Sequence, residues 1–296
     1  EADAVVIGYG AAGSAAAIDL ADRGFTSLLI EKMDKEYAGG DCSVCGGYLT
    51  DGGYTPESYR VGALNGVDTA YAEAVVPVLN DACNYLVGLG VPLQDGIPVV
   101  ASENGEPFGQ VLYHALEAAV EERADKITVM YETPGIGLVQ DPVTGEVLGV
   151  VAGSKEAPIY LKANRGVVVA SGSYEADREM TNRIHMPGVL FPTLGSPANT
   201  GDGLKMLMKA GCKAQNFGKC LEYACMGSKQ GSEEVGTGLS FPKSMAADSY
   251  IFVNCAGERF MNETAHLQHS KNDHIFQCVR FDGGLSSGID DTRYTN

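Results

Sequence analysis

Short apolar runs and amphipathic stretches alternate along the first part of the chain. The run at 4–7 is short and is followed by glycine, which predicts a buried strand. Apolar residues then recur at helical spacing over 12–23, and Gly24 follows as a typical helix-terminating residue. A second short apolar run covers 27–30. The order strand, glycine turn, helix, strand predicts a βαβ unit with parallel strands.

The pattern beyond this unit predicts further helices and strands. Helices are expected over 56–89 (with breaks near Gly66 and Pro77), 109–123 and 203–210. Strands are expected over 126–132, 147–152 and 166–170, with a hairpin turn at 141–145. The segment 36–53 is rich in glycine and lacks periodicity, so we expect a loop there. Beyond about Cys225 the chain becomes polar and glycine-rich around one predicted strand at 250–254, which places a domain boundary near Cys225.

The first predicted strand runs into the sequence Gly-Tyr-Gly-Ala-Ala-Gly at 8–13 and then into a helix, which is the context of a dinucleotide-binding fingerprint. Gly8 permits the tight turn, Gly10 lets the backbone approach a pyrophosphate, and Gly13 lets the helix pack closely on the strand. The pyrophosphate is expected at the N-terminus of the helix. Glu31 ends the second strand, where its carboxylate can accept hydrogen bonds from a ribose. The unit therefore predicts a bound dinucleotide, and NAD and FAD share this fingerprint.

Two further glycine-rich segments favour a flavin. The segment 39–47 follows the second strand and carries so few side chains that its backbone N–H groups can approach a flat ring or a phosphate. The segment 199–203 leads into a helix, where Thr200 and Asp202 can cap the helix and Gly201 can bring the backbone close to a ligand. The sequence holds one such dinucleotide fingerprint, so no second site for a nicotinamide nucleotide is predicted.

The composition narrows the choice of partners. The 296 residues carry a formal net charge of −17, and no basic stripe is available to bind nucleic acid or an anionic membrane surface. No apolar run approaches ~18 residues, so no membrane insertion is expected. Eight cysteines are too few for a disulfide scaffold in a chain of this length and favour a reducing compartment. We therefore expect a cytoplasmic protein, with export left open because the chain starts at Glu1 without a methionine.

Five segments in collinear order resemble the family of FAD-dependent oxidoreductases that contains fumarate reductase and succinate dehydrogenase flavoproteins, urocanate reductases and 3-ketosteroid dehydrogenases. The segments are 5–13 with Glu31-Lys32, 39–47, 167–174, 199–203 and 251–263. The resemblance implies an α/β fold, with a Rossmann-like FAD-binding domain and its central parallel sheet over 1–224. It also implies a smaller α+β substrate-capping domain over 225–296, which we expect to continue beyond Asn296.

The resemblance also implies which residues hold FAD. Together with the glycine fingerprint, the implied cofactor-binding residues are Gly8, Gly10, Ala11, Ala12, Gly13, Glu31, Lys32, Gly39, Gly40, Asp41, Ser43, Cys45, Gly46, Gly47, Ala170, Ser171, Gly172, Thr200, Gly201 and Asp202. The resemblance also implies that the backbone of the segment 130–136 contacts the adenine. We expect the FAD to be bound non-covalently and predict no metal site.

The chain departs from the family at the catalytic acid. Fumarate reductases place an Arg, and ketosteroid dehydrogenases a Tyr, a few residues after an Asn-Glu pair that corresponds to 262–263 here. Counted without gaps, that place holds Leu267, which cannot donate a proton. The neighbouring His266 is therefore the predicted proton donor, with Tyr294 and Tyr223 as alternatives. His266 is also one of three histidines within nine residues, for which a metal site or a solvated loop stays open.

Three functions remain open from these residues. The first is an FAD-dependent oxidoreductase that passes a hydride between flavin N5 and an activated C=C bond of an enoate or enone, steroid-like compounds included. Its partners would be this small unsaturated substrate and a redox partner protein. The second is a thiol–disulfide flavoenzyme that uses Cys42 and Cys45, a pair that packing within the flavin loop also explains. The third is a flavin-binding electron-transfer subunit with no substrate of its own.

Overall fold

The chain forms two compact units in the computed structural model. The described residues are 1–47, 54–62, 67–94, 100–102, 105–184 and 195–214. The first unit comprises 1–53, 78–177 and 195–214. The second unit comprises 54–77, 178–194 and 215–296.

The first unit contains a six-stranded sheet with helices on both of its faces. In chain order its elements are β1 (Ala2–Ile7), α1 (Ala11–Asp22), β2 (Ser27–Ile30), α2 (Gly40–Val44), α5 (Phe108–Glu121), β3 (Ile127–Met130), β4 (Gly135–Gln140), β5 (Val147–Gly153), β6 (Pro158–Val169) and α7 (Asp202–Lys209). The described part of the second unit contains α3 (Pro56–Gly62) and α6 (Arg178–Ile184). The helix α4 (Thr69–Gly88) begins in the second unit and ends in the first.

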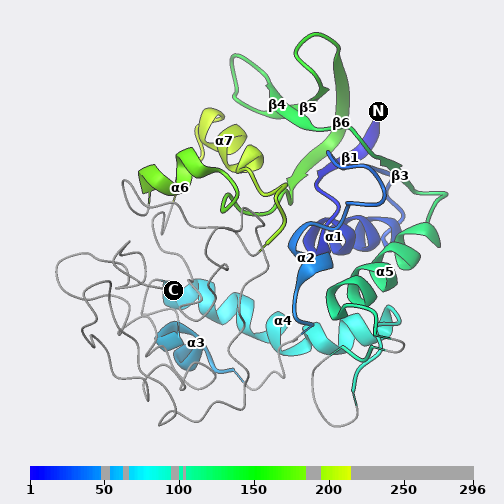
Figure 1. Ribbon diagram of the computed structural model, residues 1–296. Coiled ribbons are helices and arrows are strands. Elements are labelled where there is room, and N and C mark those ends of the chain that lie inside the picture. The colour runs from blue at the N-terminus through cyan, green and yellow to red at the C-terminus, as the bar shows by residue number, and fades with distance from the viewer. Residues whose placement is uncertain (48–53, 63–66, 95–99, 103–104, 185–194, 215–296) are drawn as a thin grey trace, which may run out of the picture. The chain divides into compact units, whose positions relative to one another are not determined.

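The sheet has the strand order β3-β2-β1-β6-β5-β4 (Figure 1). The strands β3, β2, β1 and the second half of β6 are parallel, and Ile7 of β1 pairs with Ile30 of β2 and Val169 of β6. The first half of β6 pairs with β5 in the antiparallel sense, as β5 does with β4. The strand order reverses between β1 and β6, because β2 and β3 lie on one side of β1 and β6 on the other. Open α/β sheets bind ligands at such a switch point, at the carboxyl ends of the strands.

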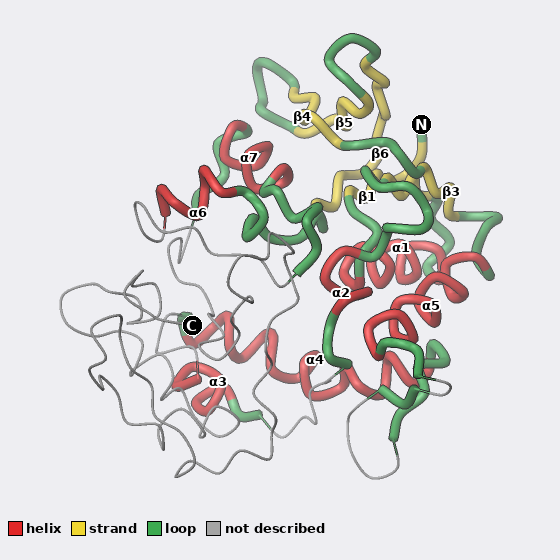
Figure 2. The backbone as a smooth tube through the Cα atoms, in the orientation of Figure 1, coloured by secondary structure: helices red, strands yellow, loops and turns green. Residues whose placement is uncertain are grey.

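Side chains of β1 alternate between two apolar layers. Val6 packs in a layer that includes Ile18 of α1 and Val120 of α5, and these two helices contact each other (Figure 2). Val5 packs on the opposite face, in a layer that includes Met206 of α7. Since both faces of the strand are covered, the short continuous apolar runs of the sequence are buried strands.

The turn from β1 into α1 is held by contacts that admit no side chain. Gly8 has a φ of +101°, and a Cβ at this position would lie 2.5 Å from the carbonyl oxygen of Ala170 after β6. A Cβ on Gly13 would overlap the carbonyl oxygen of Gly8. α1 therefore lies closer to the end of β1 than a helix with a side chain at residue 13 could. These contacts place the N-terminus of α1 beside the switch point of the sheet.

The predicted βαβ unit is confirmed, because β1, α1 and β2 lie within two residues of their predicted bounds. The helices expected over 109–123 and 203–210 are confirmed as α5 and α7, and the turn at 141–145 joins β4 to β5.

Three structural predictions need correction. The sheet is mixed rather than parallel, because β6 begins at Pro158 and its additional first half pairs with β5. The loop predicted over 36–53 contains the short helix α2, which begins after Gly39 in a left-handed conformation with φ +102°. The helix break predicted near Pro77 is absent, and α4 continues through that residue over its 20 positions. A proline removes one helical hydrogen bond, and the turns on either side maintain this long helix.

The predictions for the C-terminal part concern residues outside the described ranges. They are the boundary near Cys225, the strand at 250–254 and the capping domain over 225–296, and they stay predictions. In the described part of the chain, no helix combines the length and the apolar character needed to cross a membrane.

Replacing Gly13 with alanine should destabilise the protein, although alanine is the better helix former. The added Cβ would overlap the Gly8 carbonyl oxygen and push α1 away from β1. We expect the free energy of unfolding to fall by about 2 kcal/mol, net of the ~1 kcal/mol that helix propensity adds.

Gly88→Ala is the matched control, because Gly88 also lies in a helix and a Cβ there meets nothing within 4 Å. Chemical unfolding of both variants measures the difference. A Gly13→Ala protein as stable as the wild type would contradict the close packing of α1.

Candidate cofactor-binding site

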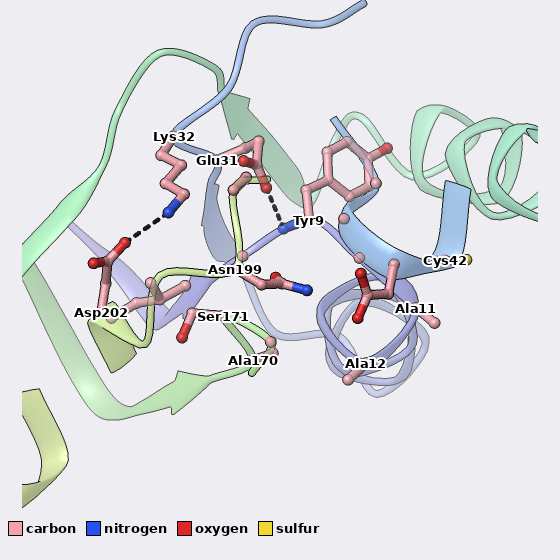
Figure 3. Close-up of a pocket in the computed structure, with 18 of the residues that line it drawn as sticks. Tyr9, Ala11, Ala12, Glu31, Lys32, Cys42, Ala170, Ser171, Asn199 and Asp202 are labelled. Atoms are coloured by element: carbon pink, nitrogen blue, oxygen red, sulfur yellow. Dashed lines mark hydrogen bonds and ion pairs between the residues drawn. The ribbon is translucent and has the colours of Figure 1, made fainter. Parts of the chain in front are cut away.

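A pocket of about 600 Å³ lies in the first unit at the carboxyl ends of β1, β2 and β6 (Figure 3). The β1–α1 turn, the end of β2, the first turn of α2, the loop after β6 and the start of α7 all contribute to its wall. Segments that are far apart in the sequence therefore converge here. The predicted cofactor-binding residues that line the pocket are Gly8, Gly10, Ala11, Ala12, Glu31, Lys32, Gly39, Gly40, Asp41, Cys45, Ala170, Ser171, Gly172 and Asp202.

The other predicted cofactor-binding residues do not line the pocket. They are Gly13, Ser43, Gly46, Gly47, Thr200 and Gly201. The Ser43 hydroxyl is buried and donates a hydrogen bond of 2.8 Å to the carbonyl oxygen of Gly40. A Cβ on Gly47 would lie 2.5 Å from Phe108, so this glycine lets α5 pack against the loop after α2. Within 130–136, the segment predicted to approach the adenine, Gly135 lines the pocket.

The N-terminus of α1 has the properties of an anion-binding site. Ala11 and Ala12 of its first turn line the pocket. The N-cap residue is Gly10, which has no side chain that could accept a hydrogen bond from that turn. The turn also contains no acidic residue. The first N–H groups of a 12-residue helix are positively polarised and need acceptors from outside the helix. A phosphate group at this end would supply such acceptors.

Three glycines in the wall serve two purposes. Gly39 has a φ of +102°, and a Cβ there would lie 2.9 Å from the ring of Tyr113, so the fold itself requires glycine. Gly10 has an extended backbone that any residue can adopt, and its Cβ would lie 3.3 Å from the carbonyl oxygen of Gly39. Gly40 has a φ of +53°, which by itself favours glycine, and a Cβ there would meet nothing within 4 Å. At Gly10 and Gly40, the missing side chains keep space open for a ligand.

Glu31 joins the end of β2 to the glycine turn. Its side chain is almost fully buried, at 8% exposure. The oxygen Oε2 accepts a hydrogen bond of 2.9 Å from the backbone N–H of Tyr9 (Figure 3). Oε1 accepts another of 2.9 Å from the backbone N–H of Met33. A carboxylate has about four acceptor positions, so capacity remains for ribose hydroxyls. The predicted ribose acceptor thus also holds the turn in place.

Lys32 joins the end of β2 to the start of α7. Its Nζ donates to Oδ2 of Asp202 at 2.7 Å (Figure 3). It also donates to the hydroxyl oxygen of Thr200 at 2.8 Å. The Thr200 hydroxyl in turn lies 3.0 Å from Oδ2 of Asp202 and can donate to it. The ion pair is partly exposed, so it contributes more to the geometry of the wall than to stability.

Cys42 and Cys45 both line the pocket as free thiols. Burial, together with the nearby Cys45, raises the pKa of the Cys42 thiol to about 12, against the opposing effect of the Ala11 backbone N–H. Only the thiolate is a good nucleophile, and a thiol with so high a pKa holds very little thiolate at neutral pH. Both cysteines also pack against an apolar cluster that contains Val100 and Leu116. These properties are those of packing residues.

Sequence reasoning missed several residues of the site. Tyr9, the variable residue inside the glycine fingerprint, is fully buried and its ring lies 5.6 Å edge-on from that of Tyr113. Asn199 lines the pocket, and its position before Thr200 in the glycine-rich segment was the available signal. Leu112 of α5 also lines the pocket, and nothing near it in the sequence indicates this. The predicted proton donors His266, Tyr294 and Tyr223 lie outside the described residues and stay predictions.

Comparison with known proteins agrees with this geometry. A family model described as an FAD binding domain matches residues 3–284. The digoxin reductase of Eggerthella lenta is 25% identical over 320 residues, which cover 90% of this chain and 55% of that protein. The fumarate reductase (cytochrome) of Shewanella frigidimarina is 27% identical over 291 residues, which cover 88% of this chain and 48% of that protein. The chain thus spans about half the length of the curated relatives it matches.

A solved structure shares the fold. The 3-ketosteroid delta1-dehydrogenase from Sterolibacterium denitrificans, in complex with 1,4-androstadiene-3,17-dione, is similar with a TM-score of 0.69. The likeness covers 91% of this chain and 66% of that chain at 18% sequence identity, so it concerns the fold alone.

Replacing Gly10 with valine should empty the pocket of its cofactor while leaving the fold intact. The extended backbone of Gly10 tolerates a side chain, but the added methyl groups would occupy the space beside the first turn of α1. We expect affinity for FAD to fall at least ~100-fold, the loss of several close backbone contacts to a phosphate. Flavin content after purification and a titration of the apoprotein with FAD measure the effect.

Gly166→Val is the control for that variant, because Gly166 lies in strand β6 and a Cβ there meets nothing within 4 Å. A Gly10→Val protein that purifies with a full complement of FAD would place the cofactor elsewhere.

Thiol labelling should spare Cys42 and modify Cys212, which is exposed. A thiol with a pKa of about 12 has roughly 1,000-fold less thiolate at neutral pH than an ordinary cysteine. Iodoacetamide treatment followed by mass spectrometry of the peptides compares the two residues. Rapid labelling of Cys42, or its ready oxidation to a disulfide with Cys45, would instead favour thiol–disulfide chemistry.

Proposed function

The chain belongs to the family of FAD binding domains, and on this basis we propose that it acts as an FAD-dependent oxidoreductase of carbon–carbon bonds. The family match over residues 3–284 carries the proposal. The two relatives compared above are both named as reductases, one of digoxin and one of fumarate. The substrate class that we propose is an activated alkene, either an enoate or an enone, with steroid-like compounds included.

The described residues fit FAD. Two phosphates need polarised N–H groups, which the N-terminus of α1 offers beside the side-chain-free Gly10. A ribose needs an acceptor, which Glu31 offers at the end of β2. A broad ring needs an open wall, and Gly40 adds no side chain to the pocket lining. When bound, FAD supplies the hydride transfer at its flavin ring.

The chain's own contribution is to bind, to orient and to supply a proton. The contact of Lys32 with Asp202 and Thr200 keeps the end of β2 and the start of α7 together, so that both flank one pocket. The reaction also needs an acid that protonates the carbon next to the hydride acceptor. His266 stays our proposed acid, with Tyr294 and Tyr223 as alternatives.

The competing functions differ in what supports them. The raised pKa of Cys42 disfavours a thiol–disulfide flavoenzyme in which Cys42 is the attacking thiolate, because such an enzyme needs an accessible thiolate at neutral pH. A flavin-binding electron-transfer subunit remains the second candidate. The pocket supports this candidate equally well, because its lining residues explain how a cofactor binds and do not identify a binding site for a substrate.

Reoxidation of the reduced protein separates the two remaining candidates. The full chain with FAD is photoreduced without oxygen and mixed with enoates, enones or ketosteroids, and the flavin absorbance is followed. We expect a saturable return of the oxidised spectrum with at least one conjugated alkene and none with its saturated analogue. If ferricyanide reoxidises the flavin and none of the alkenes does, the result would indicate the electron-transfer subunit.

Replacing His266 with alanine should lower turnover of that alkene by roughly 10²–10⁴-fold, the usual contribution of a positioned acid. FAD content should be unchanged, because we propose that FAD binds in the first unit, whereas His266 belongs to the second. His269→Ala is the matched control and should lose far less activity. If His266→Ala retains near-full turnover, Tyr294 or Tyr223 becomes the better candidate.

A further inference from the structure

Asn199 contributes a buried amide group to the wall of the pocket. The residue lies shortly before α7, and its side chain points into the pocket (Figure 3). It is only 5% exposed, although it belongs to neither a helix nor a strand. A buried amide is costly when its donor or acceptor atoms lack partners. The partners of the Asn199 side chain therefore decide what this part of the wall can bind.

Backbone hydrogen bonds hold Asn199 in place before any ligand binds. Its N–H donates to the carbonyl oxygen of Ser196 at 3.1 Å, and its own carbonyl oxygen accepts from the N–H of Ala176 at 3.0 Å. The N–H of Gly201 also donates to the carbonyl oxygen of Ser173 at 3.0 Å. The segment that carries Asn199 is thus joined at two points to the loop after β6, and a ligand that binds the side chain has little backbone to order.

Glu175 determines which end of the Asn199 amide faces away from it. The Nδ2 group of Asn199 donates a hydrogen bond of 2.6 Å to Oε1 of Glu175. A carboxylate accepts hydrogen bonds and an amide oxygen cannot donate one, so the NH₂ group has to face Glu175. The carbonyl oxygen Oδ1 then points away from Glu175. This hydrogen bond settles an orientation that the nearly identical shapes of the two amide ends leave open.

The oxygen Oδ1 of Asn199 lies against the backbone of Gly172, which also lines the pocket. A Cβ on Gly172 would lie 2.5 Å from this oxygen, and the φ of Gly172 is +73°. Glycine at this position therefore lets the amide approach the loop after β6. In the described part of the chain, no residue donates a hydrogen bond to Oδ1. The side chain thus presents an acceptor at the pocket wall.

We propose that Oδ1 of Asn199 accepts a hydrogen bond from bound FAD, and that Glu175 is the positioning residue that orients this oxygen. The ribityl hydroxyl groups and the N3–H of the flavin ring are donors of FAD that lie away from its ribose and adenine. A phosphate offers acceptors, which an amide oxygen repels, so this contact separates the ribityl–flavin part from the pyrophosphate at α1. The role of Asn199 rests on the proposed binding of FAD in this pocket and is independent of the proposed reaction.

Fluorescence titration of the full-chain apoprotein with FAD tests the contact. Asn199→Leu keeps the approximate size of the side chain and removes Oδ1. The dissociation constant should rise roughly tenfold, the effect of one neutral hydrogen bond. Asn84→Leu is the matched control, because Asn84 of α4 also donates its amide to a carboxylate, that of Asp81, at 3.0 Å and does not line the pocket. It should bind FAD as the wild type does.

Analogues of FAD separate a direct contact from a purely structural role of Asn199. Each member of one series lacks a single ribityl hydroxyl, and another analogue carries a methyl group on N3. The analogue without the contacted donor should bind the wild type roughly tenfold more weakly than FAD, and Asn199→Leu as well as FAD does. A deoxyribityl analogue with this behaviour identifies the chain as the donor, and the N3-methyl analogue identifies the ring. Equal losses in both proteins for every analogue would overturn the contact.

Two variants of Glu175 test its positioning role and serve even if Asn199→Leu does not fold. Glu175→Gln retains an acceptor for the amide and should keep the wild-type affinity for FAD. Glu175→Ala removes the acceptor and should lose part of the affinity that depends on Asn199, and wild-type affinity in this variant would contradict the role. If Gly10→Val binds FAD normally and Asn199→Leu does not, the phosphates lie elsewhere and the amide contact stands. The reverse result would leave the cofactor site in place and remove Asn199 from it.

Discussion

The pocket depends on one close contact, in which α1 approaches the end of β1 so closely that residue 13 can have no side chain. Because Gly13 lies against the Gly8 carbonyl, the first turn of α1 begins directly above the carboxyl edge of the sheet. Gly8 in turn lies against the carbonyl of Ala170, so β6 and β1 end at the same level. The polarised N-terminus of the helix and the switch point of the sheet thereby coincide. Either feature alone is common, and their coincidence is what makes a site for a dinucleotide.

The carboxylates in the pocket wall would repel the phosphates of a bound dinucleotide, so their negative charges need compensation. Three carboxylates and one ammonium group face a pocket that is to hold two phosphates. Glu31 accepts hydrogen bonds from two backbone N–H groups, Asp202 is paired with Lys32, and Asp41 accepts a hydrogen bond from the backbone N–H of Ser196.

Local signals in the sequence predicted the parts of the site that depend on neighbouring residues. Glycine spacing and two short apolar runs were sufficient for β1, α1 and β2, because each element is determined within about ten residues. The contacts that close the pocket join Lys32 to Asp202 and Asp41 to Ser196, and more than 100 positions separate the members of each pair. No local pattern encodes such a partner. The antiparallel start of β6 was missed for the same reason, since only its pairing with β5 makes it a strand.

The cysteines show how environment decides between two chemistries that one motif allows. The backbone N–H of Ala11, at the N-terminus of α1, acts on the Cys42 thiol and lowers its pKa, as a helix terminus does in many reactive cysteines. Burial has the larger effect, and the pKa rises to about 12. A phosphate bound at the same helix end would bring a negative charge close to the sulfur and disfavour the thiolate still more. A cofactor bound at the N-terminus of α1 therefore opposes a nucleophilic Cys42, and Gly10 and Gly40, which keep side chains out of the pocket, favour the cofactor.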